Sequence, residues 1–392
     1  MTMATEMWEH FDACLKCTLC VSQCPVMSVN PDFPGPKALG PEWSREAHLS
    51  EIEPMDHVDD CTFCQLCEAS CPVEVPIAHL IAHHKAQVAR RWRQRVRDGL
   101  LARPHLAARA AFLGDIPGPL RRLAGIAREV RLPRRRVSVV RRLGEPLGLR
   151  RGKVGLFLDC YTKGYDPGLG RQAAELLRLW GFEVVELPPK SGCCGAAAYA
   201  AGNPPLARAN GRRLKELVNP ALSELDMVIT LNATCDGTLR DEWPKFYGYS
   251  LDVPVVPFDE AALEAPKEFW DRLQSVSSTL VLLAHTTCRG KVARGDGQLF
   301  WLAEQAGYRG SQPAEALCCG AAGSYAFKEE HQETAGRLGA ALSDEVKKLR
   351  ADGVMTDSGT CAIHIEQGSG VIARHPAYWL YTRYLNYLEE VR

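Results

Sequence analysis

The distribution of cysteines constrains this chain more than any other feature. Sixteen of its 392 residues are cysteines, which is many for a chain of this length. A secreted disulfide scaffold would place such cysteines in a short chain behind a signal peptide. The segment Met1–Phe11 is instead polar and acidic and lacks the apolar stretch of a signal peptide. We therefore expect a cytoplasmic protein, or one attached to a membrane face, whose reduced thiols bind metal.

Eight of the cysteines form two runs with the pattern C-x2-C-x2-C-x3-C-P. The runs are Cys14, Cys17, Cys20 and Cys24, and Cys61, Cys64, Cys67 and Cys71. This spacing is typical of the bacterial [4Fe–4S] ferredoxins. Three thiolates two residues apart lie on one tight loop around three corners of a cubane cluster. The fourth thiolate, followed by proline, leaves the loop and reaches the other cluster.

The two runs therefore predict two [4Fe–4S] clusters, each bound by three cysteines of one run and the last cysteine of the other. The first cluster would take Cys14, Cys17, Cys20 and Cys71, and the second Cys61, Cys64, Cys67 and Cys24. The alternative is a pair of structural zinc sites. Zinc needs only four ligands per site and rarely uses a three-thiolate loop with a trailing Cys-Pro.

The other eight cysteines lie in an internal duplication. "GLFLDC", which ends at Cys160, matches "VLLAHTTC", which ends at Cys288, and "SGCCGAAAYAAG" matches "ALCCGAAGSYAFK". The offsets between matching cysteines are 128, 125, 125 and 126 residues. Because the register changes so little, the sequence predicts two copies of one domain.

Short β-branched runs alternate with helical patterns from about residue 151, which is typical of an α/β sheet. The predicted strands are Val154–Leu158, Glu183–Leu187, Met227–Leu231, Leu280–Ala284 and Val354–Thr356. The predicted helices are Leu169–Trp180, Leu206–Val218, Phe300–Ala306 and Glu333–Leu349. We expect an α/β protein with an α-helical, ferredoxin-like N-terminal domain and two duplicated domains with small parallel sheets. The expected domains are 1–100, a basic linker 101–150, 151–262 and 263–392.

Each copy offers a second kind of metal site with four cysteines. The sets are Cys160, Cys193, Cys194 and Cys235, and Cys288, Cys318, Cys319 and Cys361. The first and last cysteine of each set follow a predicted strand, at the sheet edge where ligands gather. The adjacent pairs precede Gly195 and Gly320, which allow close backbone approach at an expected helix start. The bound species is either a further iron–sulfur cluster or zinc.

Other polar residues near these cysteines receive a structural interpretation. His285 and His375 are interpreted as core residues, because a lone histidine beside a strand end is more often buried than ligating. Lys328, Glu329 and Glu330 are interpreted as a solvated helix face. The glycine-rich stretches lack the spacing of a dinucleotide site, so no flavin or nicotinamide site is expected.

The paired Cys-Cys-Gly motifs resemble the CCG domains of heterodisulfide reductase subunits, glycolate oxidase iron–sulfur subunits and lactate-utilisation proteins. Within this group the chain is most similar to the C subunits of anaerobic glycerol-3-phosphate dehydrogenases, over "VNPDFPGPKALGPE", "TCDGTLRDEWP" and "CCGAAGSYAFKEE". The resemblance implies an electron-transfer subunit of an oxidoreductase complex, not the subunit that oxidises substrate. Its partners would be a flavoprotein dehydrogenase for glycerol 3-phosphate or a similar hydroxy acid, and membrane quinone.

One departure from this family concerns the last cysteine of each set. Many CCG domains end in Cys-x-x-Cys, which gives five thiols, whereas Asn232 and Ser358 stand three residues before Cys235 and Cys361. Four thiolates are enough for a cubane cluster or for zinc. They are too few for a five-thiolate cluster with disulfide-reducing chemistry. A heterodisulfide or thiol reductase stays the main alternative, and a non-redox assembly module with zinc in the CCG domains is a third.

The linker is strongly basic. Between Arg90 and Lys153 there are 19 Lys/Arg and four acids, although the whole chain has a formal net charge of zero. Prolines limit this region to short helices, and no apolar run reaches the roughly 18 residues of a spanning helix. Short helices with an apolar face and an arginine rim can lie on anionic lipid, so we expect peripheral attachment to the cytoplasmic membrane face. The expected rim is Arg103, Arg109, Arg121, Arg122 and Arg128.

The charge of the linker is also compatible with a protein surface. The linker can instead dock on an acidic partner subunit or on the acidic remainder of this chain. No recognition motif accompanies the charge, so no nucleic-acid partner is expected.

Overall fold

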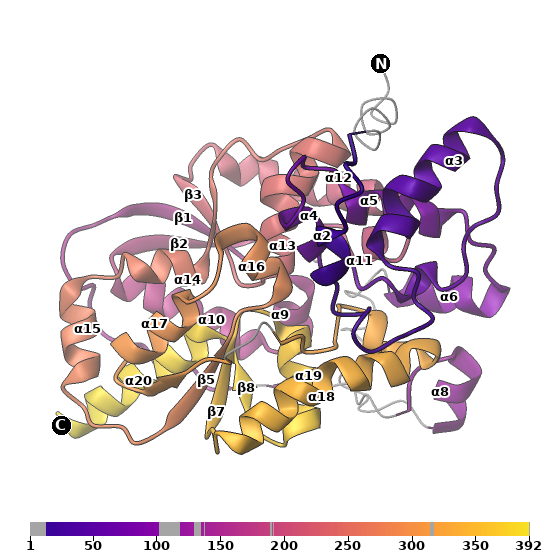
Figure 1. The fold of residues 1–392 in the computed structure, drawn as a ribbon. Helices are drawn as coiled ribbons and strands as arrows, with labels where there is room; N and C mark the ends of the chain where they lie inside the picture. Colours follow the sequence, from indigo (N-terminus) through magenta and orange to yellow (C-terminus); the bar gives the residue numbers. More distant parts are fainter. Residues whose placement is uncertain are drawn as a thin grey trace.

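The computed structural model describes residues 13–101, 118–128, 135–136, 138–188, 190, 192–313 and 317–391. A helical N-terminal unit, indigo in Figure 1, lies beside two α/β units. Part of the basic linker lies outside the described residues. This part includes Arg103, Leu106, Arg109, Phe112, Leu113, Ile116 and Arg134.

The N-terminal unit is built from short helices around the two cysteine runs. Its helices α2 (Leu19–Ser22) and α4 (Leu66–Ala69) occupy equivalent places, each containing the third cysteine of a run. The other helices are η1 (Ala38–Glu42), α3 (Trp43–Leu49), η2 (Val58–Asp60), α5 (Ile77–Ala86), α6 (Trp92–Leu101) and α8 (Gly118–Ala124). Buried side chains such as Leu39, Ile77 and Leu80 form its core.

The first α/β unit contains a four-stranded parallel sheet in the order β2-β1-β3-β4. The strands are β1 (Gly152–Phe157), β2 (Phe182–Leu187), β3 (Met227–Thr230) and β4 (Val255–Pro257). Its helices are α9 (Cys160–Gly164), α10 (Pro167–Leu179), α11 (Ala196–Ala200), α12 (Pro204–Leu222), α13 (Ala233–Gly237), η4 (Thr238–Tyr247), α14 (Phe258–Leu263) and α15 (Lys267–Gln274).

The second α/β unit repeats this arrangement with the order β6-β5-β7-β8, again all parallel. The strands are β5 (Val281–His285), β6 (Arg309–Ser311), β7 (Gly353–Thr356) and β8 (Ala373–Arg374). Its helices are α16 (Cys288–Arg294), α17 (Gln298–Gln305), η5 (Tyr325–Phe327), η6 (Glu329–His331), α18 (Gln332–Lys348), α19 (Gly359–Ser369) and α20 (Pro376–Glu390). The matching strand orders confirm the predicted duplication and the α/β fold class.

All five predicted strands and all four predicted helices are present, with ends shifted by at most four residues. Helices α10 and α12 begin where a cap residue precedes a proline. Asp166 accepts a hydrogen bond from the backbone N–H of Leu169, and Asn203 accepts one from Leu206. Both caps satisfy helix donors that lack a partner within the helix, and the following proline has no N–H to satisfy.

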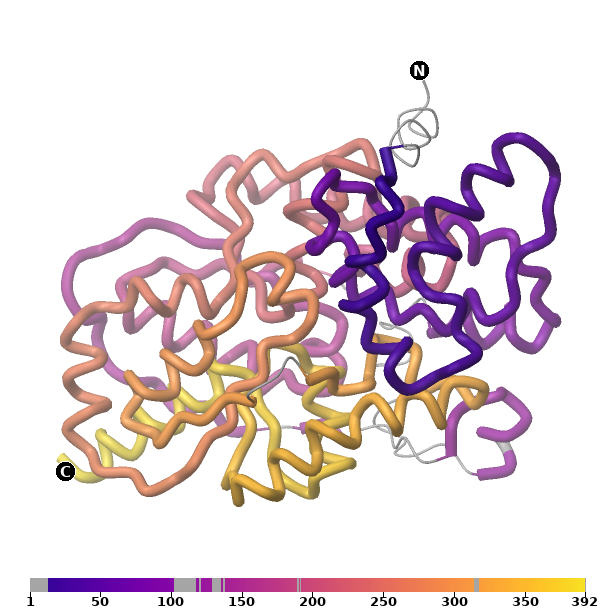
Figure 2. Tube along the Cα trace, viewed as in Figure 1, coloured from indigo at the N-terminus to yellow at the C-terminus, as the bar shows by residue number. Residues whose placement is uncertain are grey.

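The three units share two hydrophobic cores. Trp180, Phe269 and Tyr384 belong to the core that joins the two α/β units, and Leu143 and Leu147 of the linker are buried in it as well. The N-terminal unit shares a second core with the first α/β unit. In Figure 2 the indigo trace also lies against the orange trace of α18, where Arg337 donates a hydrogen bond to the carbonyl of Val29 (3.2 Å).

Candidate iron–sulfur sites

The two N-terminal cysteine loops have the same unusual backbone. Lys16 and Thr18 in the first loop, and Phe63 and Gln65 in the second, have φ between 56° and 69°. This left-handed conformation costs a non-glycine residue roughly 1–2 kcal/mol. Because the strain recurs at matching positions between the cysteines, the loop shape is required by what the loops hold.

The structure brings together thiols from both runs. Burial raises the pKa of the Cys20 thiol, and Cys14, Cys17 and, more weakly, Cys71 of the other run raise it further. Burial likewise raises the pKa of Cys24 to about 12, with smaller contributions from Cys64 and Cys61 of the second run. Each predicted ligand set is thus gathered in space, and cluster binding by these sets stays a prediction.

In both α/β units the outer cysteines lie in the first turn of helices that follow neighbouring strands. Cys160 begins α9 after β1, and Asp159 caps this helix by accepting the N–H of Tyr161 (2.8 Å). Cys288 begins α16 after β5, and Thr287 is its cap. Cys235 in α13 and Cys361 in α19 follow β3 and β7. All four therefore lie at the carboxyl edges of the sheets, as predicted.

The adjacent cysteine pairs approach these outer cysteines closely. The Sγ atoms of Cys194 and Cys235 are 3.5 Å apart, and those of Cys319 and Cys361 are 2.9 Å apart. Trp243 donates its Nε1–H to the carbonyl of Cys194 (2.9 Å), and His364 Nδ1 lies 2.5 Å from the carbonyl of Cys319. Sequence reasoning missed both supporting residues, because neither has a match in the other copy.

The glycines after the pairs allow the expected close approach. A Cβ atom at Gly195 would lie 2.5 Å from the carbonyl of Ala207, and one at Gly320 would lie 2.2 Å from the carbonyl of Ala335. The helix start predicted after Gly195 is present as α11. The one predicted after Gly320 is wrong, since turns and the short 3₁₀ helix η5 follow there.

The two α/β units open into one shared cavity of about 210 Å³ between them. Its wall contains all eight CCG-type cysteines and also Cys64 of the N-terminal unit. The rest of the wall contains aromatic side chains such as Phe63 and Tyr161 and polar ones such as Asn232 and Arg289. The two four-cysteine sets and one of the N-terminal sets thus adjoin a common space.

The thiols along this wall fit iron–sulfur clusters. No three or more His, Cys, Asp or Glu side chains in the described ranges converge as they would around a single metal ion. Burial raises the pKa of Cys288, and the charges of Cys318 and Cys319 raise it further. Buried thiolates that repel one another in this way would be stabilised by a positively charged iron core, and thiolate is its usual ligand. When bound, such clusters supply one-electron redox chemistry.

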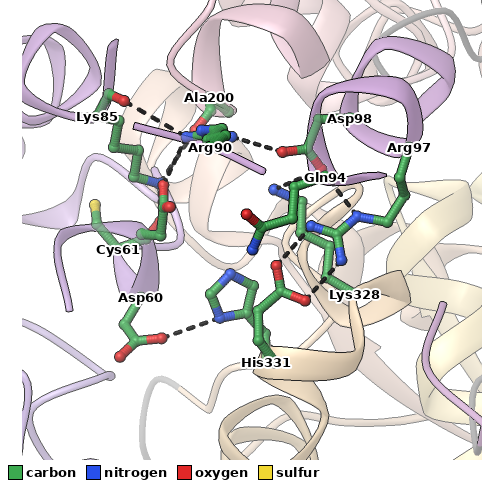
Figure 3. Close-up of polar contacts among 12 residues, drawn as sticks. Asp60, Cys61, Lys85, Arg90, Gln94, Arg97, Asp98, Ala200, Lys328 and His331 are labelled. Atoms are coloured by element: carbon green, nitrogen blue, oxygen red, sulfur yellow. Dashed lines mark hydrogen bonds and ion pairs between the residues drawn. The ribbon is translucent and has the colours of Figure 1, made fainter. Parts of the chain in front are cut away.

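The loop after the second cysteine pair is an interface with the N-terminal unit (Figure 3). Lys328 is buried and lies 3.4 Å from Asp98 Oδ1, and Glu330 pairs with Arg97. His331 Nδ1 lies 3.0 Å from Asp60 Oδ1, next to Cys61. The interpretation as a solvated helix face is therefore wrong for Lys328, which is buried, whereas Glu329 and Glu330 are exposed as predicted. The partners of Lys328 and Glu330 lie more than 200 positions earlier in the sequence, so these contacts could not be predicted from local pattern.

The two histidines predicted to be core residues are so. His285 is buried and its Nδ1 lies 3.0 Å from Thr356 Oγ1, across β5 and β7. His375 is buried as the cap of α20, where its Nδ1 accepts the N–H of Ala377 (3.1 Å). Neither lines the shared cavity.

The described part of the basic linker engages this chain's own groups. Arg121 is buried and donates to the carbonyls of Ala127 and Arg128, so the expectation that it belongs to an exposed rim is wrong. Arg136 pairs with Glu366 of the second α/β unit at 2.6 Å, and Arg141 pairs with Glu389 at 3.0 Å. These contacts support docking on the acidic remainder of the chain for this part of the linker.

Comparison with known proteins agrees with this organisation. Residues 10–75 match the 4Fe-4S dicluster domain, and residues 154–240 and 282–366 each match the cysteine-rich CCG domain. The chain is a CCG-domain iron–sulfur protein. In this CCG-domain protein the two α/β units are the two CCG domains, each holding one four-cysteine set at its sheet edge.

Two of the relatives that the chain matches are subunits of a dehydrogenase and of a reductase. The C subunit of the anaerobic glycerol-3-phosphate dehydrogenase of Escherichia coli K12 is 29% identical over 390 residues, which cover 93% of this chain and 96% of the relative. The B subunit of the fumarate reductase (CoM/CoB) of Methanothermobacter marburgensis is 27% identical over 225 residues, 55% of this chain and 42% of the relative. Lactate utilization protein A of Halalkalibacterium halodurans is 27% identical over 192 residues, 45% and 73% respectively. The resemblance read from the motifs is confirmed.

Proposed function

We propose that the chain relays single electrons from a flavoprotein dehydrogenase partner to membrane quinone. The substrate of that partner would be glycerol 3-phosphate or a similar hydroxy acid, by analogy with the relative that matches nearly the whole chain. The observation that carries the proposal is the position of Cys64. It belongs to an N-terminal cysteine set and at the same time lines the cavity of both CCG sets.

Electrons would enter at the exposed loop of the first cysteine run. Cys17 is exposed, and the neighbouring side chains of Leu15 and Leu19 are 65% and 48% exposed. Exposed leucines beside a predicted cluster suit docking of another protein, because burying them on association is favourable. The path would then run from the Cys14–Cys17–Cys20–Cys71 set to the Cys61–Cys64–Cys67–Cys24 set and on to the CCG sets.

Two groups on the cavity wall weaken the alternative of a heterodisulfide or thiol reductase. Asn232 caps α13 by accepting the N–H of Thr234 (3.1 Å), and Ser358 Oγ lies 3.2 Å from Thr360 Oγ1. Asn232 and Ser358 stand where many CCG domains have a fifth cysteine, and here they form local hydrogen bonds instead. Each set therefore has four thiols. Metal analysis distinguishes the third alternative, a non-redox module with zinc in the CCG domains.

The proposed contact with the membrane has support in helix α6. Trp92, Val96 and Leu100, spaced four residues apart, are 70%, 56% and 54% exposed and lie on one face of this helix. Exposed Arg91, Arg93 and Arg95 accompany them. An exposed apolar face with a basic rim suits the headgroup region of anionic lipid. No helix in the described part of the chain is long and apolar enough to span a bilayer.

The relay is tested with the purified chain and its flavoprotein partner under anaerobic conditions. Substrate oxidation should bleach the cluster absorbance of this chain, and a soluble quinone analogue should restore it. Reduction of a heterodisulfide at the same rate as the quinone analogue would favour the reductase alternative. Failure of the partner and substrate to reduce any cluster, with dithionite reducing them all, would refute the relay.

A further inference from the structure

A single buried carboxylate, that of Glu242, joins all three units of the protein. Glu242 lies in η4 of the first CCG domain and is 2% exposed. Its Oε1 accepts the side-chain N–H of Gln65 (2.9 Å) and also contacts the Arg289 guanidinium, while Oε2 accepts the hydroxyl of Thr238 (2.9 Å). Gln65 directly follows Cys64, and Arg289 directly follows Cys288. The carboxylate therefore links the side chains that follow one cysteine in each of two sets.

Further contacts fix Arg289 in this position. Its guanidinium carbon lies 5.8 Å from the centre of the Phe63 ring, in the second cysteine loop. A Cβ atom on Gly237 would lie 2.9 Å from Arg289 Nη2, so a side chain there would displace the guanidinium. Helix α16, which carries Arg289, packs on both α4 and α13. Arg289 is thus held from all three units.

One nitrogen of this buried guanidinium lacks a hydrogen-bond acceptor among the described residues. Arg289 is 7% exposed and lines the shared cavity, and its Nη1 has no hydrogen-bond partner among the described residues. A buried donor without an acceptor is costly, so such a group normally meets a bound ligand or water. Cys288, the preceding residue, lines the same cavity and is close enough for its charge and that of Arg289 to act on one another. A cluster bound by the Cys288 set would present sulfur atoms as acceptors.

The two CCG domains differ at this position. The residue after the first cysteine is Arg289 in the second domain and Tyr161 in the first. The first cysteine is therefore followed by a cation in the second set and by a neutral aromatic residue in the first. The second set is also the set next to the N-terminal unit, since the charges of Cys288 and Cys318 help to raise the pKa of Cys64 after burial, the main cause.

We propose that Arg289 is a positioning residue that donates a hydrogen bond to sulfur of the cluster held by the Cys288 set and raises its reduction potential above that of the Cys160 set. This rests on the proposed electron relay. Hydrogen bonds to sulfur and nearby positive charge stabilise the more negative, reduced form of a cluster. The Cys288 set then receives the electron first. In that step the Cys64 cluster loses one electron, the Cys288 cluster gains it, and no proton is required.

The test is an EPR-monitored redox titration of the full chain, purified anaerobically. The signal of the Cys288 set is identified as the one lost in Cys318→Ser. In Arg289→Gln the midpoint potential of this signal should fall by at least about 59 mV. For a one-electron couple this corresponds to a tenfold decrease in the equilibrium constant for reduction. In Arg289→Lys, which retains the positive charge, the midpoint potential should fall by less than in Arg289→Gln. Lys291→Gln removes a charge from the same helix, where Lys291 pairs with Asp296 away from the cavity, and should leave the midpoint unchanged.

Gly237→Ala provides a second variant that retains every ligand and charge. The added methyl group displaces the guanidinium, so the midpoint potential of the Cys318-dependent signal should again fall. If Arg289→Gln does not assemble the cluster, Gly237→Ala tests the role of Arg289 instead. An unchanged midpoint in the assembled variants would overturn the role of Arg289 alone. Absence of any Cys318-dependent redox signal in the wild-type protein would instead refute the proposed relay through the CCG domains.

Discussion

Arg97 of α6 and Glu330 of the second CCG domain form a two-point ion pair, with Nη2–Oε1 and Nη1–Oε2 distances of 2.5 and 2.6 Å. The two residues are 233 positions apart in the sequence. Arg97 is buried, and it also donates to the carbonyl of Gly125 (2.9 Å). The pair therefore attaches the end of the N-terminal unit, and α8 after it, to the second CCG domain.

Breaking this pair should loosen the attachment. Glu330→Gln removes the charge that compensates a buried guanidinium, and we expect a loss of about 1–3 kcal/mol. The apparent melting temperature should fall. Glu145→Gln is the matched control, since Glu145 and its partner Arg142 are both largely exposed and such pairs contribute little. Equal effects of the two substitutions would contradict the assigned role of Glu330.

Cys71→Ala should damage the cluster of the other cysteine run. In the structure Cys71 lies close enough to Cys20 for its charge to help raise the pKa of that thiol. Loss of Cys71 should therefore affect the cluster held by Cys14, Cys17 and Cys20. Two complete clusters correspond to about eight iron atoms in the N-terminal unit. The measurement is iron content together with the EPR spectrum of the reduced protein. Selective loss of the cluster held by Cys61, Cys64 and Cys67 would refute ligation across the runs.

Each CCG set should hold its own metal centre. Cys193→Ser and Cys318→Ser should each remove one centre, because each substitution leaves three thiols in that set. The N-terminal EPR signals should stay intact. Iron and zinc are measured together, which distinguishes clusters from zinc. Full metal content in both variants would show that these thiols are structural.

The stability of the CCG pair should depend on pH through Asp259. Burial raises the pKa of this carboxyl from 3.8 to about 7, although Arg294 lies 3.0 Å away and lowers it. Between these two pKa values the folded state holds a proton that the unfolded state releases. The contribution of Asp259 to stability is therefore most favourable below about pH 4 and is lost as the pH rises to 7. Asp259→Asn mimics the protonated form and should gain melting temperature relative to wild type between pH 5.5 and pH 8.

The control for this pH effect is Asp271→Asn. Asp271 is exposed and pairs with Lys267 on α15, so its substitution should give the same difference from wild type at every pH. A difference between Asp259→Asn and wild type that does not vary with pH would show that Asp259 is ionised throughout this range.

Membrane attachment should depend on α6. The chain should co-sediment with vesicles that contain anionic lipid, and binding should weaken at high salt because the attraction of basic residues to the surface is screened. Replacing Trp92 and Val96 by serine, and Arg91, Arg93 and Arg95 by glutamine, should each reduce binding. Neutralising Arg121 or Arg136 should not, since both serve contacts within the chain. If a flavoprotein partner binds through α6 and the chain does not bind vesicles, α6 is a protein interface and not a membrane contact.

The sequence predicted the elements that depend on local pattern. Cysteine spacing indicated the two ferredoxin-like runs, and the constant offset between matching cysteines indicated the duplication. Buried parallel strands such as β1 and β7 were visible because both of their faces are apolar. The edge strands β4, β6 and β8 were missed, since two or three residues are too few to show a period.

Contacts between the units could not be predicted from one sequence. Lys328 and Glu330 have the composition of a solvated helix, and only the fold brings Asp98 and Arg97 to them. Glu242 and Arg289 likewise have no local signal except that Arg289 follows Cys288. Long-range ion pairs of this kind leave no periodic trace in the sequence. They decide how the cysteine sets face one another.

The most direct test of the electron relay is freeze-quench EPR of the chain mixed with its reduced flavoprotein partner. The relay predicts that signals of the two N-terminal clusters appear first, that the Cys318-dependent signal follows, and that all disappear on addition of a quinone analogue. CCG-domain signals that appear before the N-terminal ones, or that never appear while quinone is still reduced, would contradict it.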